Sequence, residues 1–168
     1  MQRDFNLPND CSPLIREIFD YWVSIHPDKG LPGRSLFDPL DVLSLSGNIW
    51  MLDVEVEPLR FRVRRMGTAV VNFMGNDPTG SYLDEVYPKF ESSPIREHLV
   101  HAAKTGMPTF RRGNALIVPT KKYVISERII LPMASEGETV DMLLNLTCFL
   151  EDSDAEDVEI YGAAQREI

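Results

Sequence analysis

The chain has 168 residues, of which 43% are hydrophobic and 26% are charged, and this composition fits one globular domain that can build a core unaided. Its formal net charge of −9 argues against general nucleic-acid binding, because phosphate contacts need clustered Lys and Arg. Its apolar runs are far too short to span a bilayer and its N-terminus leads into no apolar segment, so we expect a cytoplasmic protein that does not engage a membrane.

The N-terminal part is expected to contain a flexible leader, residues 1–11, followed by an amphipathic helix. Ser12 is a favourable N-cap and Pro13 a favourable first helical residue, so the helix should begin there and end near His26 and Pro27. Apolar residues then recur at intervals of three and four, which places them in one stripe on the helix. The stripe consists of Leu14, Ile18, Tyr21, Trp22 and Ile25.

Residues 27–37 are rich in Pro and Gly and read as a connector, and Asp38 and Pro39 open a short helix that runs to about Leu45. Alternating apolar residues then predict a strand from Ile49 to about residue 56, and a second strand around residues 60–64 forms a hairpin with it. A short helix is expected over residues 69–74, closed by a glycine.

A longer helix opens at Ser93 and Pro94 and ends near Gly106, with Ile95, Leu99, Ala102 and Ala103 as its inner stripe. Three strands are predicted within residues 109–118, 123–131 and 140–150. Alternation in the last strand predicts a core-facing set of Val140, Met142, Leu144, Leu146 and Cys148. Two strands precede the helical segment and three follow it, which predicts one five-stranded antiparallel sheet with helices on one face. The whole is an α+β domain over residues 12–150. Residues 151–168, rich in Asp and Glu, should form a solvated acidic tail.

This order of elements resembles that of a PAS domain, and three segments resemble one bacterial family of standalone single-domain PAS proteins. The segments are residues 31–40, residues 61–68 with Gly75 and the pair at 79–80, and residues 129–133 with Gly137 and the pair at 140–141. The resemblance spans about residues 13–150 and implies a PAS fold. It also implies a sensory or regulatory module that binds a small molecule between sheet and helices or docks on a signalling partner. Because the resemblance includes no kinase, cyclase or DNA-binding module, the output is expected to pass through a partner.

We expect no cofactor, no metal and no catalytic residues. A haem-binding PAS domain would need an axial ligand, often a histidine of the long helix, but a helical wheel turns His98 and His101 roughly 85° and 145° away from the inner stripe. They are therefore predicted to lie at the surface. The segment with a reactive cysteine that a flavin photosensor would need is absent, and Cys11 and Cys148 lie in no metal-binding spacing. No nucleophile, base and oxyanion donors form a recognisable set.

The first functional hypothesis is a non-catalytic module that acts by protein–protein interaction, with a signalling partner or with a second copy as a homodimer. If Leu144 faces the core, Leu143 and Phe149 point outward, beside Ile49 and Met51 of the first strand. Such an apolar patch is seldom bare on a soluble monomer, so the N-terminal helix should cover it, in its own chain or in a second copy. The expected interaction surface comprises Leu14, Ile18, Trp22, Ile25, Ile49, Met51, Leu143 and Phe149.

The alternative hypothesis is a small-molecule sensor with a cavity between the sheet and the long helix. Aromatic and aliphatic residues on the predicted inner faces are candidates for its lining, although residues of this kind also form ordinary core. The candidate ligand-binding residues are Trp50, Phe61, Phe73, Tyr87 and Leu99.

Overall fold

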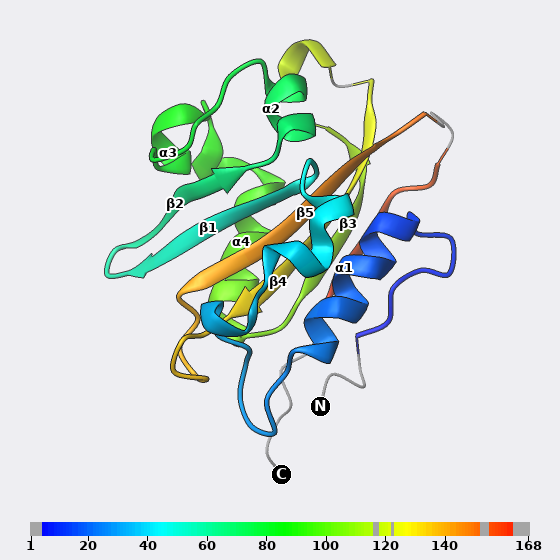
Figure 1. The fold of residues 1–168 in the computed structure, drawn as a ribbon. Helices are drawn as coiled ribbons and strands as arrows, with labels where there is room; N and C mark the ends of the chain where they lie inside the picture. Colours follow the sequence, from blue (N-terminus) through cyan, green and yellow to red (C-terminus); the bar gives the residue numbers. More distant parts are fainter. Residues whose placement is uncertain (1–4, 116–117, 122, 152–154, 163–168) are drawn as a thin grey trace.

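The computed structural model describes residues 5–115, 118–121, 123–151 and 155–162. One antiparallel sheet runs through the molecule, with helix α1 on one face and helix α4 on the other (Figure 1). The helices are α1 (Pro13–Ser24), α2 (Thr68–Met74), α3 (Leu83–Val86) and α4 (Pro94–Thr105), and the short 3-10 helices are η1 (Arg34–Leu36), η2 (Pro39–Leu45), η3 (Phe90–Ser92) and η4 (Pro119–Lys121). The strands are β1 (Ile49–Val56), β2 (Leu59–Met66), β3 (Thr109–Asn114), β4 (Ile125–Met133), β5 (Met142–Leu150) and β6 (Val158–Tyr161). The expected α+β class is confirmed.

Helix α1 begins as the sequence predicts. The Ser12 hydroxyl accepts a hydrogen bond from the backbone N–H of Leu14 at 3.3 Å, which satisfies one of the free donors of the first turn. The helix packs on β4 and β5 with Ile15, Ile18 and Trp22 fully buried. The amphipathic stripe therefore covers the sheet of its own chain.

In the described part of the chain the sheet has six strands in the order β2-β1-β5-β4-β3-β6, one more than the sequence predicts. The additional strand β6 lies in the segment expected to be an acidic tail, and it pairs antiparallel with β3, with Thr109 opposite Tyr161. Val158 and Ile160 of β6 pack against the core on the α1 side. The short alternation of apolar residues in this strand is masked by the acidic composition around it.

The described part of the predicted leader also packs against the domain. Phe5 and Leu7 are buried, and the ring of Phe5 lies 5.5 Å from that of Phe19 on α1. An ion cluster follows in the chain: Arg112 on β3 donates to Asp10 at 3.0 Å and to Glu127 on β4 at 3.0 Å. These contacts hold the segment before α1 on the sheet, where the sequence predicts a loose chain.

The face assignment predicted for β5 is wrong. Residues that pair across antiparallel strands share a face, and Met51 pairs with Leu144 while Leu52 pairs with Leu143. Met142, Leu144, Leu146 and Cys148 therefore face α1 together with Ile49 and Met51. Leu143 faces α4 with Leu52, and Val140, which the sequence grouped with Leu144, also lies on the α4 side. Both faces of this sheet are buried, so the alternation of residues defines two sets but does not tell which helix each set meets.

Among the described residues, no helix has the length and apolar character that crossing a membrane would require.

Candidate functional site

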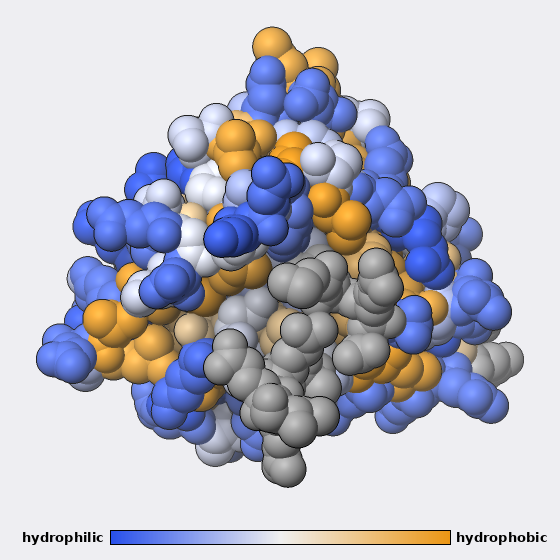
Figure 2. Space-filling view, turned by 90° about the horizontal axis from the view of Figure 1, so that it is seen from below, coloured by the Kyte–Doolittle hydropathy of each residue, from blue (hydrophilic) through white to orange (hydrophobic). Residues whose placement is uncertain are grey.

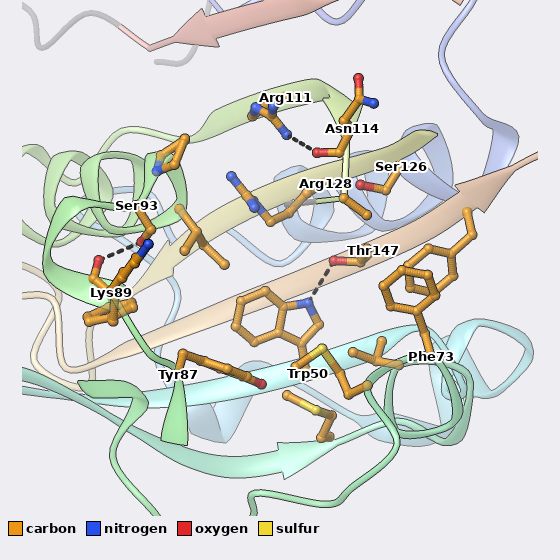
Figure 3. A pocket seen from close by; sticks show the side chains of 18 of the residues that line it. Trp50, Phe73, Tyr87, Lys89, Ser93, Arg111, Asn114, Ser126, Arg128 and Thr147 are labelled. Atoms are coloured by element: carbon orange, nitrogen blue, oxygen red, sulfur yellow. Dashed lines mark hydrogen bonds between the residues drawn. The ribbon is translucent and has the colours of Figure 1, made fainter. Parts of the chain in front are cut away.

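A cavity of about 440 Å³ lies on the α4 side of the sheet, between the sheet and the segment that carries α2, η3 and the start of α4 (Figure 3). Small-molecule sites commonly measure roughly 300–1,000 Å³, so this cavity is large enough for an organic ligand. Its lining comprises Trp50, Met66, Val70, Phe73, Met74, Tyr87, Pro88, Lys89, Phe90, Ser92, Ser93, Pro94, Ile95, Arg111, Asn114, Ala115, Ser126, Arg128, Thr147 and Phe149.

Local signals in the sequence shape the wall that faces the sheet. Helix α2 ends at Gly75, whose φ of +84° is a left-handed conformation that glycine adopts without strain. Helix α4 begins after Ser93, whose hydroxyl accepts from the backbone N–H of Arg96 at 3.4 Å. The chain between these two ends lies over the sheet and brings Tyr87 and Lys89 to the cavity.

One part of the lining is aromatic. Trp50 of β1 is buried and its indole Nε1 donates to the Thr147 hydroxyl at 3.0 Å, so its only polar atom is satisfied. Phe73 of α2 stacks on Phe149 of β5, with ring centroids 4.1 Å apart and planes 20° apart. Burial raises the pKa of Tyr87 to about 12, which keeps its phenol neutral at physiological pH. This part of the cavity suits an apolar group.

The other part is polar and cationic, and strands β3 and β4 supply it. Arg128 lies between Arg111 on one side and Trp50 on the other (Figure 3). Burial, together with the charge of Arg111, lowers the pKa of Arg128 to about 9. Arg111 itself donates from Nη1 to the carbonyl of Asn114 at 3.1 Å.

A comparison with models of protein families matches the PAS domain over residues 11–147. The chain belongs to the PAS domain family. Comparisons with curated proteins and with solved structures find no match. PAS domains are sensory and regulatory modules in general, which gives the class of function but not the signal.

The structure separates the five ligand-binding candidates of this PAS domain. Trp50, Phe73 and Tyr87 line the cavity. Phe61 and Leu99 are buried on the same side of the sheet but do not line it, and they are ordinary core.

Sequence reasoning missed the two arginines of the PAS cavity. A signal for Arg128 was present, since Glu127 and Arg128 are consecutive charged residues in a strand whose other residues, apart from Ser126, are apolar. Two such neighbours on a strand point to opposite faces, and both must then be accommodated in a sheet that is buried on both sides. Each charge should therefore have a counter-ion or a function.

The expected interaction surface divides between the two faces of the sheet. Its members on α1 and β1 form the contact between that helix and the sheet, in which Trp22 and Ile49 are buried. Leu14 and Ile25 pack at the margin of this contact. Phe149 instead lines the cavity. Alternation grouped Phe149 with Ile49, but both faces of the sheet are buried, so alternation alone does not tell which helix each residue meets.

The prediction of a surface position is wrong for His98, which is fully buried. Strand β6 covers that flank of α4 and places the ring of Tyr161 4.4 Å from the imidazole. Burial lowers the pKa of His98 to about 3, with smaller contributions from the charges of Arg128 and Arg111, so the ring is neutral at physiological pH. His98 does not line the cavity.

His101, one turn further along α4, is partly buried, and its Nε2 donates to the carbonyl of Gly162 at 2.7 Å. Within the described part of the chain, no group of three or more His, Cys, Asp or Glu side chains is placed to hold a metal ion.

Proposed function

We propose that this PAS domain is a non-catalytic sensor whose signal is a small molecule bound in the cavity between the sheet and the segment of α2, η3 and α4. The observation that supports this proposal is the combination, in one cavity of about 440 Å³, of an aromatic wall with a buried guanidinium. Small-molecule sites have this character: a mostly apolar lining with a few convergent polar groups that orient the ligand.

In this proposal the ligand acts on the helices rather than on the sheet. The sheet side of the cavity is held by continuous strand pairing, whereas α2 and η3 on the opposite side are short elements of seven and three residues. A ligand that contacts both sides stabilises one arrangement of these short helices by its affinity for that arrangement. A protein partner would then read the outer surface of the same segment.

Protein–protein interaction through α1 has less support, because the apolar stripe of this helix is buried in its own chain. A partner contact elsewhere has one observation in its favour, since η2 exposes Leu40 by 75% and Leu43 by 62%. On the face seen in Figure 2, apolar groups are interspersed with hydrophilic side chains. A partner that receives the signal is therefore part of the proposal, and self-association is an outcome that the experiment below detects.

The experiment compares two tryptophan substitutions on α2. Met74 lines the cavity, whereas Asn72 on the same helix is exposed and does not line it. The neutral fluorescent probe N-phenyl-1-naphthylamine should bind the unmodified domain with a stoichiometry of one. Met74→Trp should weaken its binding at least tenfold, and Asn72→Trp should leave it unchanged.

Far-UV circular dichroism of both variants checks that they fold, and native mass spectrometry of the same samples reports bound molecules and oligomeric state together. Equal binding of the probe by all three proteins, or binding by none, would contradict a sensor that uses this cavity.

A further inference from the structure

Neighbouring pairs of residues across strands β3 and β4 carry very different charges. Arg112 lies opposite Glu127, and the next pair places Arg111 opposite Arg128. The first pair faces α1 and is satisfied, because Glu127 accepts from Arg112 at 3.0 Å and also accepts from the backbone N–H of Ser12 at 2.8 Å. The second pair faces the cavity and joins two cations. Like charges directly opposite each other destabilise a sheet, so this arrangement costs stability in the free protein.

Among the described residues, no carboxylate forms an ion pair with Arg128 that would explain its burial, although the more distant charge of Glu159 acts favourably on it. Arg128 is only 8% exposed. Its Nε and Nη2 atoms make no hydrogen bond with any residue that the structure describes. An unpaired buried charge is among the most expensive features of a folded protein. The lowered pKa of Arg128 has the same origin, since burial and the charge of Arg111 both oppose protonation.

The surroundings leave the Arg111–Arg128 pair with about one uncompensated positive charge. Glu159 of β6 is half exposed, and its Oε1 lies 3.4 Å from Nε of Arg111, so it offsets one of the two guanidiniums. His98 adds no charge near neutral pH. Among the described residues that line the cavity there are three cations, Lys89, Arg111 and Arg128, and no carboxylate. The whole chain carries a net charge of −9, so this lining differs strongly from the average of the molecule.

The apolar part of the cavity restricts the kind of anion. The stacked rings of Phe73 and Phe149 and the indole of Trp50 line the cavity together with Arg128 (Figure 3). A small hydrated anion would gain nothing from these rings. A molecule with an apolar body and one carboxylate matches both parts of the lining and the one uncompensated charge of the arginine pair.

We propose that the ligand of this cavity is a monocarboxylate with an apolar body, bound with its carboxylate on Arg128 and its body among the aromatic residues. The inference rests on the proposed sensor function and names its ligand class. Guanidinium and carboxylate groups form two parallel charge-assisted hydrogen bonds, and Nε and Nη2 are adjacent donors with the geometry for this pairing.

The test uses linear carboxylates from butyrate to decanoate and the primary alcohols of the same chain lengths, titrated by calorimetry into the full chain. At the chain length that binds best, the carboxylate should bind at least tenfold more tightly than its alcohol. Arg128→Met should abolish this preference by weakening the carboxylate and leaving the alcohol unchanged. The matched control is Arg65→Met, which removes the same charge from an exposed position on β2.

Thermal unfolding without ligand gives a second measurement. Because Arg128→Met replaces an unpaired buried charge with an apolar chain, its Tm should equal or exceed that of the unmodified protein. A large loss of Tm would mean that Arg128 is a structural residue and would overturn the proposal.

The titrations distinguish failure of this inference from failure of the sensor function. If alcohols bind as tightly as carboxylates, or if Arg128→Met keeps the preference, the anion proposal is wrong while the cavity remains a binding site. If neither series binds and N-phenyl-1-naphthylamine also fails to bind, the sensor function is wrong as well.

Discussion

Replacing Trp22 with alanine should reveal how much helix α1 contributes to the stability of the domain. Trp22 is fully buried between the helix and the sheet, and its Nε1 donates to the carbonyl of Pro132 on β4 at 3.0 Å. Truncating a buried aromatic residue to alanine costs about 3–5 kcal/mol. Leaving the Pro132 carbonyl without its donor adds about 1 kcal/mol. The expected loss of about 4–6 kcal/mol is a large part of the roughly 5–15 kcal/mol that stabilises a typical domain.

Urea unfolding followed by far-UV circular dichroism measures this loss without relying on tryptophan fluorescence. With a slope of about 2 kcal/mol per molar urea, the midpoint should fall by about 2–3 M. Val23, the next residue on α1, is 44% exposed, so Val23→Ala is the matched control and should change the free energy of unfolding by less than about 0.5 kcal/mol.

The concentration dependence of unfolding separates the two possible arrangements of α1. A helix that packs on its own chain gives a midpoint that is independent of protein concentration, which we expect over a hundredfold range. A midpoint that rises with concentration would show that the helix is exchanged between copies. A loss below about 1 kcal/mol for Trp22→Ala would refute the packing argument itself.

Three further predictions concern other parts of the domain. The pKa of His98 is about 3 in the folded state and about 6.5 in the unfolded state. Between these values only the unfolded chain binds the proton, so stability should fall as the pH decreases, by about 2 kcal/mol at pH 5. Denaturation curves recorded at several pH values give the slope of the free energy of unfolding against pH, and His98→Leu should make this slope smaller. An unchanged slope would contradict the prediction. Glu127→Gln should cost about 3 kcal/mol in urea unfolding because it leaves the Arg112 guanidinium without its buried counter-charge, and the double variant Glu127→Leu/Arg112→Met should recover stability. Gly67→Ala should cost about 1–3 kcal/mol, since its Cβ would overlap the Gly47 carbonyl oxygen, and a Tm within a degree of the unmodified protein would show that the backbone can yield there.

The sequence by itself determined the local structure and the family. Capping by Ser12 and the spacing of apolar residues located α1, and turn residues separated the strands, because these signals act within a few residues of one another. The order of elements was enough to indicate the PAS fold that the family match shows. Of the five residues that the sequence proposed for a cavity lining, Trp50, Phe73 and Tyr87 line the cavity of the structure, whereas Phe61 and Leu99 do not.

The tertiary structure decided which helix each face of the sheet meets. Where one face of an antiparallel sheet is exposed to water, the polar residues of each strand mark that face. In β5 the set of Leu144 is apolar, whereas the set of Leu143 includes the polar residues Asn145 and Thr147, and Asn145 is nevertheless buried. Polarity along the strand therefore does not tell which helix each set meets. Only the packing of α1 on one side and α4 on the other assigns them, and α1 lies more than a hundred positions away from β5 along the chain.

The tertiary structure also created the cationic part of the candidate site. Arg111 and Arg128 come from strands that pair across the β3–β4 connection, and Glu159, which offsets one of them, comes from a strand hidden in an acidic segment. Sequence patterns report the average environment of each residue along its own element. Whether a buried guanidinium has a partner depends on all the elements that surround it, so the lack of one for Arg128 among the described residues becomes visible only when the sheet has assembled.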